Sequence, residues 1–166
     1  MAPLAVASSE QERGPSRRGA RGSVTLYAET SAVLRWLFAE EGGEALRIEF
    51  AAADKVVSSR LTLIETRRVI RRAEREGRIS AVEGAGVRAI FAQAASTWAV
   101  LEITEEIGRR AEEGFPSEPV RTLDAIHLAS ALFLRQSFPD LAVVTADERV
   151  RENAALLGFR MSSTRA

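Results

Sequence analysis

The chain has 166 residues, no cysteine and a formal net charge of zero, so disulfides, thiolate metal sites and a global basic field are excluded. Its 46% hydrophobic and 28% charged content fits one soluble domain with a sizeable core. No apolar run approaches the roughly 20 residues that span a bilayer, and residues 1–22 lack the apolar block of a secretory signal. We therefore expect a cytoplasmic protein that does not contact a membrane, with a disordered tail at residues 1–22.

The first half of the chain alternates one short apolar run with two helical patterns. Residues 24–28 read as a strand, and Thr30 or Ser31 is a suitable N-cap for a helix that ends at the glycine pair 42–43. The following predicted elements are a helix over 44–53, a strand over 56–58, a helix over 61–76 and a helix over 81–95. A capping box of Ser80 and Glu83 marks the start of the last helix.

The second half continues the succession of strands and helices. Its predicted elements are a strand over 98–103, a helix from Thr104 to 113, a helix over 122–136, a strand over 141–144, a helix over 149–157 and an edge strand over 159–161. Strands separated by helices predict an α/β fold, a three-layer α/β/α sandwich around a mostly parallel sheet of four to five strands. We assign this domain to residues 23–161, between the N-terminal tail and a C-terminal tail at 162–166.

Four acidic residues occupy places where parallel sheets form their sites. Glu29 and Asp147 follow predicted strands, Asp124 lies in the first turn of a helix, and Glu65 lies among apolar helix residues, which we interpret as facing a pocket. Gathered together they would repel one another unless a cation neutralised them. Oxygen ligands without cysteine favour Mg²⁺ or Mn²⁺, which can activate water for attack on a phosphodiester. A phosphoacceptor domain also gathers acids at strand ends, but it needs a lysine after a late strand, and Lys55 is the only lysine.

The segments that carry these acids resemble the four signature segments of PIN-domain ribonucleases, and most resemble those of VapC-type toxins from bacterial toxin–antitoxin pairs. The segments are residues 27–32 (YAETSA), 61–65 (LTLIE), 122–129 (TLDAIHLA) and 144–147 (VTAD). The resemblance extends over residues 24–160. It implies a PIN-like fold and an Mg²⁺- or Mn²⁺-dependent endoribonuclease with RNA as substrate. It also implies inhibition by a cognate antitoxin protein and assembly as a homodimer.

By this resemblance Glu29, Glu65, Asp124 and Asp147 are the catalytic, metal-binding acids. The first acid of the family is usually Asp, whereas this chain has Glu29, one methylene longer. The alternative function is therefore a weak or inactive PIN module that binds RNA or a partner protein.

Polar neighbours of the acids have two interpretations each. Thr30, Ser31 and Thr145 could hold a carboxylate or a metal-bound water, and helix capping explains Thr30 or Ser31 equally well. His127 shares a helix face with the acid three residues before it, and either orients that carboxylate or is a hydrogen-bonded core histidine. Arg121 could contact phosphate or pair with an acid.

Further along the chain, arginines recur at helical spacing and form a basic stripe, either an RNA contact or a solvated face paired with Glu74 and Glu76. The stripe consists of Arg67, Arg71, Arg75 and Arg78. Trp36 and Trp98 lie on apolar faces and are expected in the core, not as platforms for stacking bases.

Overall fold

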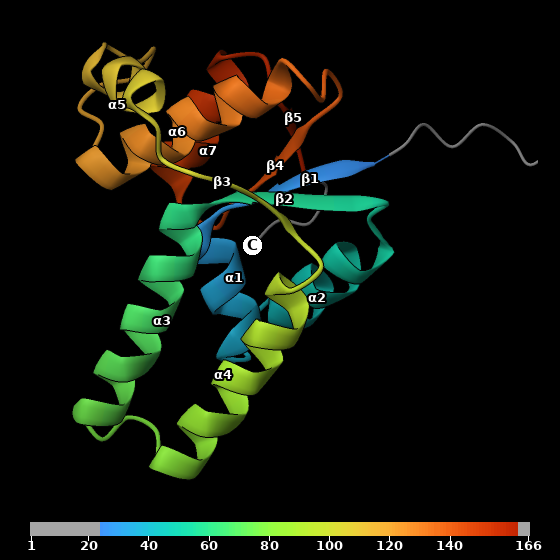
Figure 1. The fold of residues 1–166 in the computed structure, drawn as a ribbon, viewed down its shortest axis with the longest axis vertical. Helices are drawn as coiled ribbons and strands as arrows, with labels where there is room; N and C mark the ends of the chain where they lie inside the picture. The colour runs from blue at the N-terminus through green and yellow to red at the C-terminus, as the bar shows by residue number, and fades with distance from the viewer. Residues whose placement is uncertain (1–23, 163–166) are drawn as a thin grey trace, which may run out of the picture.

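The computed structural model describes residues 24–162, so the predicted N-terminal tail and most of the C-terminal one lie outside the described residues. The strands are β1 (Thr25–Ala28), β2 (Lys55–Ser59), β3 (Ala99–Leu101), β4 (Ala142–Val144) and β5 (Arg160–Met161). The helices are α1 (Thr30–Leu37), α2 (Gly43–Ala52), α3 (Arg60–Arg75), α4 (Ala81–Ala95), α5 (Glu105–Glu112), α6 (Thr122–Arg135) and α7 (Glu148–Leu156). The order of elements confirms the order predicted from periodicity (Figure 1).

The described strands form one parallel sheet in the order β3-β2-β1-β4-β5. β1 lies in the centre, where Leu26 is in register with Val56 on one side and Ala142 on the other. Because β1 and β4 are neighbours, the residues that follow them meet at one edge of the sheet although they are far apart in the chain. This strand order brings the segment after residue 28 next to the segment after residue 144.

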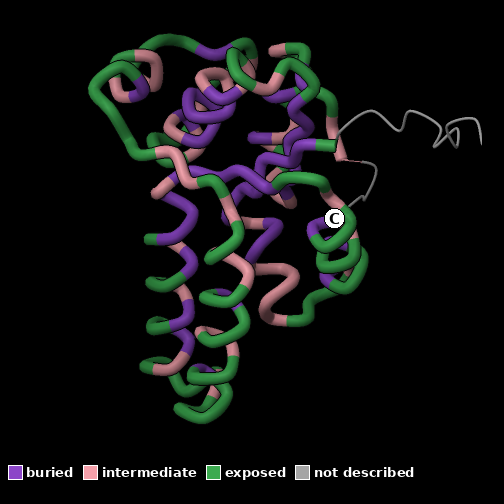
Figure 2. The backbone as a smooth tube through the Cα atoms, turned by 45° about the vertical axis from the view of Figure 1, so that its right-hand side comes forward, coloured by how far each residue is buried: buried purple, intermediate pink, exposed green. Residues whose placement is uncertain are grey.

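Side chains alternate across the sheet and build a core on each face. Leu26 and Ala28 belong to the core under α1, α2 and α4, whereas Tyr27 belongs to the core under α6 and α7. Helices therefore cover both faces of the sheet, as predicted, and Figure 2 shows the buried backbone running through the middle of the molecule.

The α3 and α4 helices form a hairpin that extends away from the sheet (Figure 1). The Ser80–Glu83 capping box at the start of α4 is confirmed, and an ion pair between Glu74 and Arg88 joins the two helices. A Cβ atom at Gly84 of α4 would collide with the Glu74 side chain. The missing side chain thus provides the space through which Glu74 reaches Arg88.

Several predicted boundaries were wrong. Thr30 and Ser31 do not cap α1, because the Glu29 carboxylate takes that place by accepting from the Ser31 N–H. α1 ends at Leu37 and not at the glycine pair, which begins α2 where the backbones of the two helices approach closely. The third strand has three residues instead of six.

Within residues 24–162, no helix has the length and apolar content needed to cross a membrane.

Candidate functional site

Glu29 is a buried carboxylate at the carboxyl end of β1. Its N–H donates to the Val144 carbonyl oxygen at 3.1 Å, so its side chain begins where β1 and β4 end together. Its Oε2 accepts from the Ser31 N–H at 3.0 Å and from the Thr145 hydroxyl at 2.8 Å, and the Ser31 hydroxyl also donates to it. Glu29 is 4% exposed, and these three donors compensate for the water it has lost.

The same two hydroxyls connect Glu29 to Asp147. Ser31 Oγ accepts from the Asp147 N–H at 3.0 Å, and Thr145 Oγ1 accepts from it at 3.1 Å. Asp147 is the N-cap of α7, and its Oδ1 accepts from the N–H groups of Arg149 and Val150 at 2.9 and 3.1 Å. Ser31 and Thr145 therefore act as carboxylate holders, one of the two roles that the sequence allowed them.

Glu65 reaches the same region from α3. The beginning of α3 is attached to the end of β1, where the Thr62 hydroxyl donates to the Ala28 carbonyl at 3.2 Å. Glu65 Oε2 accepts from the Thr30 hydroxyl at 2.6 Å and lies 2.8 Å from His127 Nε2. Burial acts to raise the pKa of Glu65, but the hydrogen bonds from His127 and Thr30 outweigh it and lower that pKa below its ordinary value. Glu65 is therefore ionised at neutral pH.

His127 is buried between two acids and a phenol. Its Nε2 lies 2.8 Å from Glu65 Oε2 and 3.6 Å from Glu29 Oε1, while its Nδ1 lies 2.9 Å from the Tyr27 hydroxyl. An ionised carboxylate only accepts, so Nε2 carries a proton and, in the neutral ring, Nδ1 accepts from Tyr27. The core interpretation of His127 is confirmed by its 2% exposure, and its carboxylate partner is Glu65 and not Asp124.

Asp124 lies in the first turn of α6 with one oxygen buried and without a hydrogen bond. Its Oδ2 is 3.7 Å from Arg149 Nη1, which is an ionic contact but too long for a hydrogen bond. Burial and the negative charge of Asp147 raise the pKa of Asp124, and Arg149 and Arg121 act against this rise. Arg121 is itself exposed, and no carboxylate of the described residues lies within 4.0 Å of it.

The four predicted acids thus form two pairs, which the hydroxyls of Ser31 and Thr145 connect through Glu29 and Asp147. Glu29 and Glu65 both approach Nε2 of His127, and the negative charge of Asp147 acts on Asp124. Within residues 24–162 no three or more Asp, Glu, His or Cys side chains are arranged as a group that could hold a metal ion. The predicted four-acid metal site therefore remains a prediction.

The chemistry of these donors fits a hard cation. Of the buried side-chain atoms without a partner in residues 24–162, Asp124 Oδ2 is the one with a formal negative charge. An unpartnered buried carboxylate oxygen is destabilising, and a bound cation would relieve that cost. Asp147 uses Oδ1 for capping, and no described residue donates to its Oδ2.

Two residues that contact the predicted site residues were not predicted from the sequence. Tyr27 was placed in a strand and in the first signature segment but was given no role. Its role depends on its pointing to the α6 side of the sheet, where it meets His127. Arg149 follows Asp147 by two residues, and this proximity to a predicted ligand was a signal that could have identified it.

Comparison with known proteins agrees with this architecture. The PIN domain family matches residues 26–156. Ribonuclease VapC35 of Mycobacterium tuberculosis is 32% identical over 136 residues, which cover 81% of this chain and 93% of that protein. Ribonuclease VapC45 of the same species is 27% identical over 137 residues, covering 82% and 94%.

Solved structures share the fold at low identity. The sarcin–ricin loop cleaving toxin VapC20 of M. tuberculosis aligns with a TM-score of 0.58 at 16% identity, over 85% of this chain and 99% of that one. A toxin–antitoxin complex from Klebsiella pneumoniae aligns with a TM-score of 0.56 at 18% identity, over 86% and 99%. The fold, the family match and the named relatives together show that this chain belongs to the PIN domain family and is related to VapC ribonucleases.

Proposed function

We propose that the chain is a metal-dependent endoribonuclease of the VapC type. The observation that carries this proposal is the buried Asp124 Oδ2, which lacks a hydrogen bond and lies beside the charge of Asp147, at the carboxyl ends of the strands in a PIN domain. The relatives are named ribonucleases, which supports RNA as the substrate. The scissile bond would be a phosphodiester, and the expected products carry a 3′-hydroxyl and a 5′-phosphate.

Asp124 and Asp147 would hold Mg²⁺ or Mn²⁺, with Glu29 and Glu65 completing the acidic site. Such an ion activates water and stabilises charge on a phosphodiester oxygen. The chain's own contribution is orientation. Ser31 and Thr145 hold the Glu29 carboxylate, and the hydrogen bonds of Glu65 occupy its Oε2 and leave Oε1 able to accept from a water molecule.

Glu29 favours one alternative, a PIN module that binds RNA or a protein without cleaving. Its longer side chain reaches back to cap α1 and is occupied by Ser31 and Thr145, so it has fewer lone pairs to offer a metal ion. In that alternative the acids have only a structural role at the edge of the sheet. RNA binding without cleavage would support it.

The test is cleavage of a mixed pool of single-stranded and structured RNAs, with sequencing of the product ends. We expect cleavage with Mn²⁺ or Mg²⁺, none with EDTA, and 5′-phosphate ends. Asp124→Asn should abolish it, whereas the matched variant Asp140→Asn, which removes an exposed carboxylate of a turn, should retain it. Metal-independent cleavage, or full activity of Asp124→Asn, would refute the proposal.

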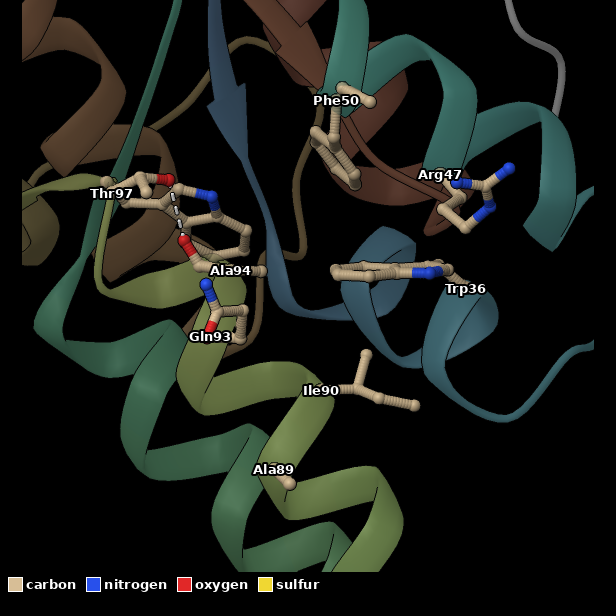
Figure 3. Close-up of a pocket in the computed structure, with 10 residues that line it drawn as sticks. Trp36, Arg47, Phe50, Ala89, Ile90, Gln93, Ala94 and Thr97 are labelled. Atoms are coloured by element: carbon tan, nitrogen blue, oxygen red, sulfur yellow. Dashed lines mark hydrogen bonds between the residues drawn. The ribbon is translucent and has the colours of Figure 1, made fainter.

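We also propose an antitoxin as protein partner, bound at an apolar pocket between α1, α2 and α4. Trp36 and Trp98 were expected in the core, but they are partly exposed and line this pocket of about 660 Å³. Phe50 lies between them, with ring centroids 6.1 Å from Trp36 and 6.0 Å from Trp98. Figure 3 shows the Trp36 ring between Phe50 and Ile90, and Ile90 is 54% exposed.

An aromatic pocket between helices fits the apolar side of an amphipathic helix. Similar folds include toxin–antitoxin complexes, which supports an antitoxin as the source of that helix. Co-purification of the chain with the product of its neighbouring reading frame should be lost in Ile90→Asp and retained in Val82→Asp, an exposed position of the same helix outside the pocket. Equal loss in both variants would remove the pocket from the interface.

As part of the same proposal, the chain forms a homodimer. Light scattering of the purified chain measures its mass directly, and a monomer at micromolar concentration would refute this part alone.

A further inference from the structure

The exposed arginines of α3 have no acidic partners of their own. Within residues 24–162, no carboxylate lies within 4.0 Å of any of them. They are Arg67, Arg68, Arg71, Arg72 and Arg75. The solvated-face interpretation required pairing with Glu74 and Glu76, but Glu74 pairs with Arg88 of α4 and Glu76 pairs with Arg78. The predicted pairing is therefore wrong for Arg67, Arg71 and Arg75 and is confirmed for Arg78 with Glu76. Arg68 and Arg72 were not part of the predicted stripe.

Four of these arginines also share a concave surface. A hollow of about 290 Å³ is lined by Arg68, Arg71, Arg72 and Arg75. Four like charges around one hollow repel each other, and a polyanion relieves this repulsion. Guanidinium groups bind phosphate in a bidentate manner, so a phosphate backbone suits the surface well.

The hollow begins beside the acidic site. Arg68 and Arg72 follow Glu65 by three and seven residues, so they lie on the same side of α3 as that carboxylate. At 1.5 Å per residue, Arg72 lies about 10 Å and Arg75 about 15 Å from Glu65 along the helix axis. At about 3.4 Å per stacked nucleotide, this is about three to five nucleotides.

We infer that α3 binds the sugar–phosphate backbone of the RNA on one side of the scissile bond, through Arg68, Arg71, Arg72 and Arg75, over a tract of about three to five nucleotides. This inference rests on the proposed function, because the acids define where the tract begins. Contacts to the backbone do not distinguish one base from another. The arginines of α3 therefore increase RNA affinity and fix the direction in which the RNA lies, without a sequence preference.

Binding is tested in the Asp124→Asn background with EDTA, using a 20-nucleotide single-stranded RNA. Arg68→Gln/Arg72→Gln should weaken binding by about a hundredfold, or about tenfold for each lost contact, which is the lower end for hydrogen bonds to charged groups. It should also reduce the slope of log affinity against log salt by about 1.4, or about 0.7 for each lost phosphate contact. Arg109→Gln/Arg160→Gln is the matched control, since both of these arginines are exposed and have no carboxylate within 4.0 Å among the described residues.

Cleavage then tests direction. RNAs that carry zero to six nucleotides on either side of the mapped cleavage point are compared in active protein. Added nucleotides on one side should raise kcat/KM until about five are present, and Arg68→Gln/Arg72→Gln should remove this gain on that side alone. Arg68→Lys/Arg72→Lys should recover most of it, because the charge is retained.

The outcomes separate the two proposals. Cleavage by the wild type with equal losses in the α3 pair and the control pair would overturn the α3 inference alone. RNA binding that depends on α3, without metal-dependent cleavage, would refute the proposed hydrolysis and leave the inference standing. Unchanged RNA affinity combined with weaker antitoxin binding would assign the arginines to an acidic protein segment and overturn the inference.

Discussion

Replacement of Asp124 by Asn should stabilise the metal-free protein at neutral pH. The wild type keeps a carboxylate oxygen buried without a hydrogen bond, next to the charge of Asp147. An unsatisfied buried group costs about 1–3 kcal/mol, and more when it is charged. Asn leaves an amide atom in the same place, so the substitution removes only the part of this cost that comes from the charge. Asp124→Asn also loses the 3.7 Å ionic contact with Arg149, whose side chain is more than one third exposed. This loss costs about 0–1 kcal/mol of stability. The net effect is therefore a gain of at most about 1 kcal/mol, which corresponds to a rise in Tm of up to about 2–4 °C for a chain of this size.

The gain should depend on pH in a defined direction. Burial and Asp147 raise the pKa of Asp124 in the folded state. A carboxyl group with a raised folded pKa adds stability below its unfolded pKa, and this contribution is lost as pH rises through the folded pKa. The difference in Tm between Asp124→Asn and the wild type, measured in EDTA from pH 4 to pH 8, should therefore be small at low pH and grow as pH rises.

Added Mn²⁺ should reverse the order. A cation that binds the folded site alone stabilises the wild type by about 2.7 kcal/mol at a hundred times its Kd, and should not stabilise Asp124→Asn/Asp147→Asn. Asp140→Asn is the control, with the wild-type response to both pH and Mn²⁺. A lower Tm for Asp124→Asn in EDTA at pH 7, or an equal Mn²⁺ shift in the wild type and the double variant, would refute the reasoning.

Three shorter predictions concern the surroundings of this site. Glu29→Asp should lower activity, because the shorter side chain withdraws an oxygen from the site and from its hydrogen-bond donors. Glu29→Gln should nearly abolish activity, because it removes the charge. Equal cleavage rates for the wild type and both variants would show that Glu29 is not a ligand. Tyr27→Phe should destabilise the fold by about 1–3 kcal/mol in urea unfolding, since His127 Nδ1 loses its partner in a buried place, and a loss below about 0.5 kcal/mol would argue against that hydrogen bond. Gly43→Ala should destabilise by about 1–3 kcal/mol, since a Cβ atom would lie 2.4 Å from the Arg35 carbonyl oxygen, whereas Gly86→Ala in α4, where the Cβ meets nothing within 4 Å, should be neutral or stabilising.

The order of elements could be read from the sequence because it depends on local patterns. Periods of 3.6 and 2 residues, apolar runs and capping residues each act over a few positions, and they identified the sequence of strands and helices along the chain. The Ser80–Glu83 capping box is local in the same way and was predicted to the residue. The acids after β1 and β4 could be located for the same reason, since each adjoins a recognisable element.

The tertiary structure decided which side chains meet. The strand order places β1 between β2 and β4, and only this neighbourhood lets Thr145 and Ser31 hold the Glu29 carboxylate. Because α3 is attached to β1, Glu65 is the carboxylate partner of His127, although the spacing along α6 suggested Asp124. Trp36 and Trp98 have the pattern of core residues, and their partial exposure follows from how α1, α2 and α4 leave a pocket between them. These outcomes depend on contacts between segments far apart in the chain, and local periodicity carries no information about which segments pack together.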